Sequence, residues 1–186
     1  MRPVGPEPAA APGWLDELPP PMVYLTLGTI FNEPALFRPL LDSLNGEVSA
    51  LVTTGRDLDP ATLGAVPSRA RVERFVPQAH VLPHCAAVVT HGGSGTTLGA
   101  LAHGLPLVLV PQGADQFDNA ARCAAAGVAV VVRPDELTAE TVRAALHRVL
   151  DEPSFAVAAR NMAAEIAAMP TPEETAHTVE EYVTRG

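Results

Sequence analysis

From Val23 onward, short apolar or β-branched runs alternate with longer stretches in which apolar residues recur every three or four positions. The short runs predict buried strands, and the three-to-four-residue spacing predicts helices with one buried face. The predicted strands are 23–27, 48–53, 72–75, 87–90, 107–110 and 128–132, and the helices between them are 35–44, 94–103 and 116–126. This alternation predicts an α/β fold, a Rossmann-like open parallel sheet with helices on both faces.

After Val132 the pattern becomes wholly helical, with predicted helices at 138–150, 154–169 and 173–185. The last is opened by Thr171 as the cap and Pro172 as its first residue. In an open parallel sheet, ligands bind outside the carboxyl ends of the strands, where the chain turns into a helix. We therefore expect the functional residues at these turns.

The first 21 residues differ from the rest of the chain. Residues 3–21 hold seven of the 19 prolines, a composition that favours extended, solvated backbone over packing into a core. We interpret residues 1–21 as the remnant of an interdomain linker and residues 22–186 as one domain, a division that fits the length of the chain. A linker at this position leads us to expect a further domain before it.

Charge and composition exclude several classes of function. The net charge is −9 and all 12 basic residues are arginine, so no broad positive surface is available for nucleic acid or anionic lipid. No apolar run is long enough to span a membrane, and the amino terminus has no secretion signal pattern, so we expect a cytoplasmic protein. Cys85 and Cys123 lack metal-ligand spacing and are expected to be free thiols.

The glycine-rich segment VVTHGGSGTTLGALAHG, residues 88–104, joins a predicted strand to a predicted helix. Its glycines allow backbone N–H groups to approach an anion, and the helix start adds its dipole, so the turn suits a diphosphate. The alternative is a turn that only permits tight packing. A Walker A loop is excluded because the chain has no lysine, and a dinucleotide fingerprint because Leu98 stands where the third glycine is needed.

A second segment, ERFVPQAHVLPHC, spans residues 73–85. Phe75 is placed to end a strand, where an aromatic ring can stack on a base, although a phenylalanine at the end of a strand more often belongs to the core. His80 and His84 have the spacing of two metal ligands on a helix, but Pro83 between them and the absence of a nearby carboxylate argue against a metal site.

The third segment is LVLVPQGADQFDNAARCAAAG, residues 107–127. Asp115 and Gln116 lie where the chain enters a helix. A carboxylate that accepts hydrogen bonds, next to an amide that both donates and accepts, suits the hydroxyls of a sugar. The alternative is that Asp115 is only the N-cap of a helix with an acidic first turn.

The motifs FVPQ, HGGSGTT and PQGADQFDNA, in this order and spacing, closely resemble the donor-binding signature of family 1 glycosyltransferases, especially the bacterial enzymes that modify antibiotics. The resemblance covers the chain from Val23 onward and implies the C-terminal half of a GT-B fold, with residues 22–186 as the nucleotide-sugar donor-binding domain. It implies nucleotide contacts from Phe75, Val76 and Gln78, and sugar contacts from Asp115 and Gln116. It also implies diphosphate contacts from Gly28, Thr29, His91, Gly93, Ser94, Gly95 and Thr96.

The sequence departs from the family pattern at three points. Gly99 replaces a glutamate that grips ribose hydroxyls in many members, and Phe75 replaces a common tryptophan. No histidine matches the catalytic base, which the family carries in its amino-terminal acceptor domain, so no catalytic residue is predicted in this chain.

The implied function is the UDP- or dTDP-sugar-binding half of an inverting glycosyltransferase that acts on a small-molecule or natural-product acceptor and needs no metal or other cofactor. The expected partners are the donor and an acceptor-binding domain or subunit. Two alternatives stay open. One is a nucleotide-sugar-binding subunit that works with a separate acceptor-binding chain. The other is a nucleotide-sugar epimerase that would use His91 and Asp115.

Overall fold

The computed structural model describes residues 10–28, 33–44 and 46–184. Its centre is one six-stranded sheet with the strand order β3-β2-β1-β4-β5-β6, and every neighbouring pair of strands is parallel. The strands are Met22–Thr26 (β1), Ser49–Thr53 (β2), Ala70–Glu73 (β3), Cys85–Thr90 (β4), Leu107–Leu109 (β5) and Ala129–Val131 (β6). The predicted α/β fold with a parallel sheet is confirmed.

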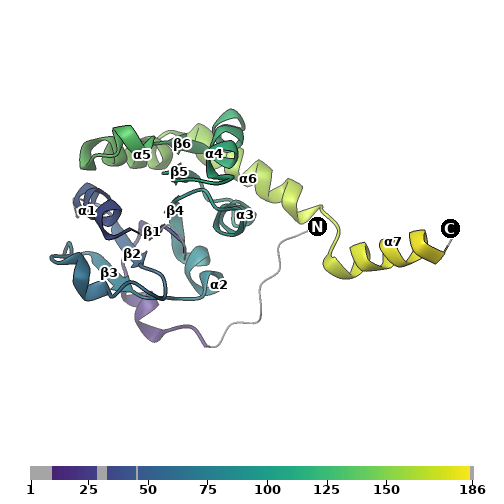
Figure 1. The fold of residues 1–186 in the computed structure, drawn as a ribbon, viewed down its shortest axis with the longest axis horizontal. Coiled ribbons are helices and arrows are strands. Elements are labelled where there is room, and N and C mark those ends of the chain that lie inside the picture. Colours follow the sequence, from purple (N-terminus) through teal and green to yellow (C-terminus); the bar gives the residue numbers. More distant parts are fainter. Residues whose placement is uncertain (1–9, 29–32, 45, 185–186) are drawn as a thin grey trace.

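Helices cover both faces of this sheet (Figure 1). They are Pro34–Ser43 (α1), Gln78–Val81 (α2), Ser94–Ala102 (α3), Gln116–Ala125 (α4), Ala139–Asp151 (α5), Pro153–Ala167 (α6) and Pro172–Thr184 (α7). Short 3-10 helices occupy Gly13–Glu17 (η1), Pro60–Leu63 (η2), Leu82–His84 (η3) and Pro134–Glu136 (η4). Helix α7 has no buried residue among those described and extends away from the sheet.

Two apolar cores lie on opposite faces of the sheet, because successive strand side chains point to opposite faces. Val23 and Leu25 of β1 pack with α1 and α5 in one core, whereas Met22 and Tyr24 pack with α3 and α4 in the other. All five residues of β1 are buried, as expected for a central parallel strand covered on both sides.

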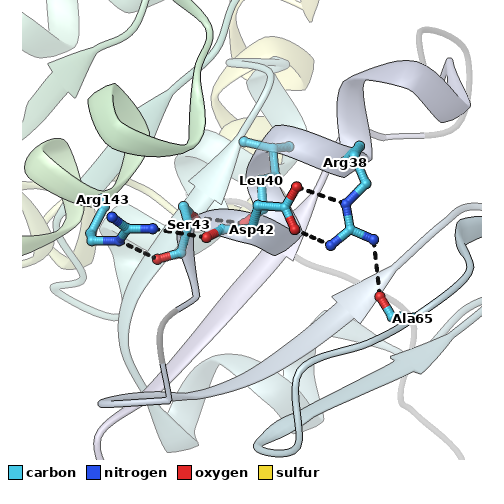
Figure 2. Close-up of polar contacts among 6 residues, drawn as sticks. All are labelled: Arg38, Leu40, Asp42, Ser43, Ala65 and Arg143. Atoms are coloured by element: carbon cyan, nitrogen blue, oxygen red, sulfur yellow. Dashed lines mark hydrogen bonds and ion pairs between the residues drawn. The ribbon is translucent and has the colours of Figure 1, made fainter.

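An arginine of α5 forms hydrogen bonds with the end of α1 (Figure 2). Arg143 of α5 donates from Nε to the carbonyl of Ser43 at 3.3 Å and from Nη2 to the carbonyl of Asp42 at 3.0 Å. The last carbonyls of a helix have no partner within the helix, so Arg143 satisfies two of them. On the same helix, Arg38 pairs with the Asp42 carboxylate and donates to the carbonyl of Ala65 at 3.0 Å.

The amino-terminal segment packs more closely than its composition predicts. Residues 1–9 lie outside the described residues. In η1, however, Leu15 is 2% exposed and belongs to the second core, and the Arg71 guanidinium lies 4.0 Å from the centroid of the Trp14 ring. The expectation of extended, solvated backbone is therefore wrong for residues 13–17, because Trp14 and Leu15 supply apolar surface. The division at residue 21 stays a prediction.

The strand order reverses direction between β1 and β4. From β1 the chain proceeds outward to β2 and β3, and then returns to place β4 on the other side of β1. At such a point the connections leave in opposite directions and open a crevice at the carboxyl ends of the two strands.

Within the described ranges, none of the helices combines the length and apolar character that crossing a bilayer requires.

Candidate functional site

A cavity of about 410 Å³ lies at the carboxyl ends of the strands, where the strand order reverses. It brings together residues from all three sequence motifs and from the turn after β1. The predicted site residues that line it are Gly28, Phe75, Val76, Gln78, His91, Gly93, Ser94, Gly95, Thr96, Asp115 and Gln116. The remaining predicted residue, Thr29, lies outside the described residues.

His91 is held between two glycines. A β-carbon on Gly28 would lie 2.6 Å from His91 Cε1, and one on Gly93 would lie 2.3 Å from His91 Nε2, so only residues without a side chain leave room for the ring. The ring nitrogen Nδ1 is 3.1 Å from the hydroxyl of Thr90. Burial lowers the pKa of His91, and the Asp115 charge only partly opposes this effect, so the imidazole is neutral at pH 7.

Helix α3 begins at the cavity without a side-chain cap. Its N-cap residue is Gly93, which has no side chain to accept a hydrogen bond from the first turn. The first backbone N–H groups of a helix have no partner within the helix, and the helix dipole places partial positive charge there. Because Ser94, Gly95 and Thr96 line the cavity, this end of α3 can bind an anion.

Asp115 belongs to a polar cluster on the cavity wall. Its Oδ2 accepts hydrogen bonds from the Ser94 hydroxyl at 3.1 Å and from Asn119 Nδ2 at 3.0 Å. These bonds, that from Asn119 first, lower the pKa of Asp115, so its carboxylate is ionised at neutral pH. Asp115 is the N-cap residue of α4, as the alternative expects, and Asp118 makes the first turn of that helix acidic. The Asp115 side chain, however, makes no capping hydrogen bond to α4 and binds Ser94 and Asn119 instead.

Asn119 was not predicted as a site residue, yet it connects the turn after β4 to the start of α4. Its Nδ2 donates to the Gly92 carbonyl at 3.0 Å and lies 3.3 Å from the Ser94 hydroxyl, in addition to its bond to Asp115. The signal in the sequence is spacing, because residues four apart on a helix share a face. Asn119 thereby fixes the position of Asp115 relative to the glycine-rich turn.

Gln116 is 3% exposed and orders the loop that precedes α4. Its Oε1 accepts from the backbone N–H of Gln112 at 2.8 Å and of Gly113 at 3.2 Å. In the same loop, Ala114 has a φ of 52°, a conformation that residues other than glycine rarely adopt. The amide oxygen of Gln116 is therefore already engaged, and its amide nitrogen is the group left for a ligand.

Phe75 lies in a loop and not at the end of a strand. The predicted strand 72–75 is observed at Ala70–Glu73, two residues earlier, because Ala70 and Arg71 pair with β2 in place of Arg74 and Phe75. The Phe75 side chain is 55% exposed, whereas that of Val76 is 3% exposed and packs in the second core. The alternative that Phe75 is a core residue is therefore wrong.

Buried polar residues form the floor of the cavity. The Tyr24 hydroxyl lies 2.8 Å from the Thr53 hydroxyl, and burial raises the pKa of Tyr24. Gln78 Nε2 donates to the Thr96 hydroxyl at 2.9 Å. Tyr24 and Thr53 were missed because a tyrosine and a threonine in strands are typical of any sheet. Gly99 lies beside this floor, where a β-carbon would be 3.6 Å from Gln78 Oε1.

The described residues contain no group of three or more His, Cys, Asp or Glu side chains that could hold a metal ion. Cys85 and Cys123 are both free, as expected from their spacing. His80 and His84 lie in α2 and η3, and neither lines the cavity.

Comparisons with known proteins identify relatives over most of the chain. Residues 39–182 match the family described as erythromycin biosynthesis protein CIII-like, C-terminal domain. The chain is 39% identical to the 4'-demethylrebeccamycin synthase of Lentzea aerocolonigenes, over 84% of this chain and 38% of that protein. It is 37% identical to the aklavinone 7-beta-L-rhodosaminyltransferase of Streptomyces galilaeus, over 95% of this chain and 41% of that protein. The chain thus spans about two fifths of the length of these relatives.

Solved structures share the fold. The spinosyn forosaminyltransferase SpnP is 32% identical, with a TM-score of 0.86 over 99% of this chain and 49% of that chain. The glycosyltransferase VinC, solved in complex with dTDP, is 34% identical, with a TM-score of 0.84 over 96% of this chain and 46% of that chain.

Proposed function

The chain belongs to the erythromycin biosynthesis protein CIII-like C-terminal domain family of natural-product glycosyltransferases, and on that premise we propose that its cavity binds the nucleotide-sugar donor. The observation that carries the proposal is the meeting of three features in one cavity: the uncapped start of α3, the neutral His91 and the exposed ring of Phe75. Together they offer complementary surfaces to a diphosphate and to a base.

The diphosphate binds at the start of α3. The N–H groups of Ser94, Gly95 and Thr96 point toward the anion, and His91 adds one N–H donor from its neutral ring. Gly28 and Gly93 contribute by leaving room for that ring. Negative charge grows on the diphosphate as it departs, so donors fixed in advance stabilise the transition state more than the bound donor sugar. This arrangement supplies the stabilisation without a metal ion.

The nucleoside binds at the other end of the cavity. The base stacks on the exposed ring of Phe75, and because the Val76 side chain is buried in the core, Val76 acts through its backbone groups. Gln78 lines the same cavity and donates to Thr96 of α3, and its amide meets the ribose. The base is uracil or thymine, and the dTDP bound in the structure of VinC supports a pyrimidine diphosphate.

The sugar binds against Asp115 and Gln116. The Asp115 carboxylate, ionised and held by Asn119, accepts hydrogen bonds from sugar hydroxyls. Gln116 contributes its amide nitrogen, because its oxygen holds the loop of Gln112 and Gly113. The sugar thus lies next to the diphosphate site, because Asp115 accepts a hydrogen bond from Ser94 at the start of α3.

The reaction is an inverting displacement in which an acceptor hydroxyl attacks the anomeric carbon and nucleoside diphosphate departs. All six histidines lie in the described part of the chain, and of these only His91 lines the cavity, where it faces the leaving group. The resemblance to family 1 glycosyltransferases implies that the base that deprotonates the acceptor is a histidine of an acceptor-binding domain, which the longer relatives have length to include.

Calorimetric titration of the chain with dTDP, UDP, NAD and ATP tests donor binding. We expect dTDP or UDP to bind and His91→Ala to weaken that binding, because one donor to the diphosphate is lost. Tight binding of NAD or ATP, without binding of either pyrimidine nucleotide at millimolar concentration, would overturn the proposal.

A transfer assay tests whether sugar transfer requires an acceptor-binding domain in addition to this chain. We expect the 186-residue chain to bind the donor but to transfer no sugar to small acceptors, and to gain transfer activity when an acceptor-binding domain of a relative is joined to it. Holding donor, acceptor and base together is worth about 7–11 kcal/mol, and one side of the cleft cannot supply it. Robust transfer by this chain alone would place an acceptor site within it.

A further inference from the structure

The exposed ring of Phe75 needs support that the core does not give. Its side chain is 55% exposed and belongs to neither apolar core. An unsupported ring on a loop samples several rotamers, and ordering it on binding lowers affinity. A residue that orders the ring before the ligand arrives therefore raises the affinity.

Arg56 contacts this ring. Its guanidinium carbon lies 5.4 Å from the centroid of Phe75, within the range of a cation–π contact. Phe75 lines the cavity, whereas Arg56 is not among its lining residues. The guanidinium therefore contacts the Phe75 ring without being part of the cavity lining.

The backbone of Arg56 is itself fixed relative to Phe75. The loop after β2 continues the pairing with the chain after β3, because Thr54 N donates to the Glu73 carbonyl and Gly55 N to the Arg74 carbonyl, both at 3.0 Å. Arg74 closes the arrangement: its Nη1 donates to the Arg56 carbonyl at 3.4 Å and its Nη2 pairs with Asp59 at 3.1 Å. The two loops thus form one unit.

We infer that Arg56 is a positioning residue for base recognition: its guanidinium contacts the Phe75 ring from outside the cavity lining and holds the ring ready to stack on a pyrimidine base within the cavity. This inference rests on the proposed function, since it concerns the base of the donor. It extends the base site to the loop after β2, which no sequence motif identified.

A competing explanation is that Arg56 attracts the diphosphate as a charge at a distance. The two explanations differ in the ligand they require. Support of the ring matters only for a ligand with a base, whereas attraction of charge matters equally for inorganic pyrophosphate. They also differ in their dependence on Phe75, because an arginine that acts through the ring has no effect once the ring is gone.

The test is a set of calorimetric titrations with dTDP, UDP and inorganic pyrophosphate. We expect Arg56→Ala to weaken binding of dTDP or UDP about 2–5-fold, the range of an exposed cation–π contact, and to leave pyrophosphate binding unchanged. Arg56→Lys, which keeps the charge without the planar group, should fall between Arg56→Ala and the wild type. In the Phe75→Ala background, Arg56→Ala should have no further effect.

The chain offers a matched control. Arg148 lies 5.7 Å from the centroid of Phe155, an arginine–phenylalanine pair of the same kind that does not line the cavity. Arg148→Ala removes the same charge and should leave nucleotide binding unchanged. The inference would be overturned if Arg148→Ala weakened nucleotide binding as much as Arg56→Ala does. It would also be overturned if Arg56→Ala weakened pyrophosphate binding as much as nucleotide binding, or if it still weakened nucleotide binding to the same extent in the Phe75→Ala background.

A measurement without nucleotide separates this inference from the proposed function. With Trp14 replaced by phenylalanine and Phe75→Trp introduced, the single indole reports on the loop. We expect its fluorescence anisotropy to fall when Arg56→Ala is added, because the ring gains freedom. Unchanged anisotropy would show that Arg56 does not order the ring. A wild-type chain that binds neither dTDP nor UDP would instead overturn the proposed donor binding, and the anisotropy result would still be valid.

Discussion

The imidazole of His91 occupies the space that a β-carbon on Gly93 would need, with Nε2 only 2.3 Å from that position. A flexible side chain could normally move away from such a clash. His91 cannot do so easily, because on its other side a β-carbon at Gly28 would already lie 2.6 Å from Cε1. Gly28 and Gly93 are therefore required by the His91 ring itself, whichever ligand the cavity binds.

Gly93→Ala should displace the His91 ring from the cavity. The expected result is weaker binding of dTDP or UDP by about 1.5–3 kcal/mol, the range for a lost hydrogen bond to a charged group. Calorimetry measures the change, and Gly13→Ala is the control, since a β-carbon there meets nothing within 4 Å. Identical affinities for wild type and Gly93→Ala would show that His91 does not contact the diphosphate.

Phe75→Ala should weaken nucleotide binding by roughly 1–3 kcal/mol, the cost of losing an aromatic stacking platform. The fold should survive, because Phe75 is 55% exposed. Phe37→Ala provides the contrast: this ring is fully buried in α1, and its loss should lower the free energy of unfolding by about 3–5 kcal/mol. An unchanged dissociation constant for a well-folded Phe75→Ala chain would remove the ring from the base site.

Tyr24→Phe should lower the free energy of unfolding by about 0.5–1.5 kcal/mol, because the buried Thr53 hydroxyl loses its partner at 2.8 Å. Thr53→Val should cost less in the Tyr24→Phe background than in the wild type, since both polar groups are then absent. Urea denaturation of the four chains measures this coupling. Strictly additive costs would show that the two hydroxyls do not depend on each other.

The stability of the chain should fall as the pH is lowered from about 6.5, in part through His91. Burial lowers the pKa of His91 in the folded chain below its ordinary value of 6.5, so the unfolded chain takes up a proton first. The contribution is complete above pH 6.5 and is lost as the pH falls toward the lowered pKa. His91→Gln should show a smaller loss of unfolding free energy between pH 7.5 and 5.5, and an equal loss would contradict the assignment.

The sequence predicts the strands and most helices because burial on both faces of a parallel sheet leaves continuous apolar runs. The three motifs also predict the family, which the match over residues 39–182 confirms. Phe75 was misplaced by two residues because no periodicity marks the end of β3, a short and half-buried strand. The 3-10 helices were not predicted, since a single turn leaves no periodic pattern.

Contacts between distant segments were also beyond sequence reasoning. Asn119 contacts Gly92 because parallel strands bring their carboxyl ends to one edge, and Tyr24 contacts Thr53 because β1 and β2 are neighbours in the sheet. Arg56 gave no signal, since an exposed arginine in a loop is common on any surface. The motifs therefore predicted residues that line one cavity, whereas the residues that hold the motif side chains in place required the fold.

The contact between Arg143 and the end of α1 has a consequence for the chain during its synthesis. Arg143 follows Ser43 by 100 residues and Asp42 by 101. At a translation rate of about 5–20 residues per second, α1 leaves the ribosome roughly 5–20 s before the arginine that completes its last turn. During that interval the carbonyls at the end of α1 can form hydrogen bonds only with water, and one face of the nascent sheet is not yet covered by α5. A pause in translation beyond residue 43 therefore prolongs the exposure of an apolar surface, and a chain released before residue 143 lacks the contact altogether.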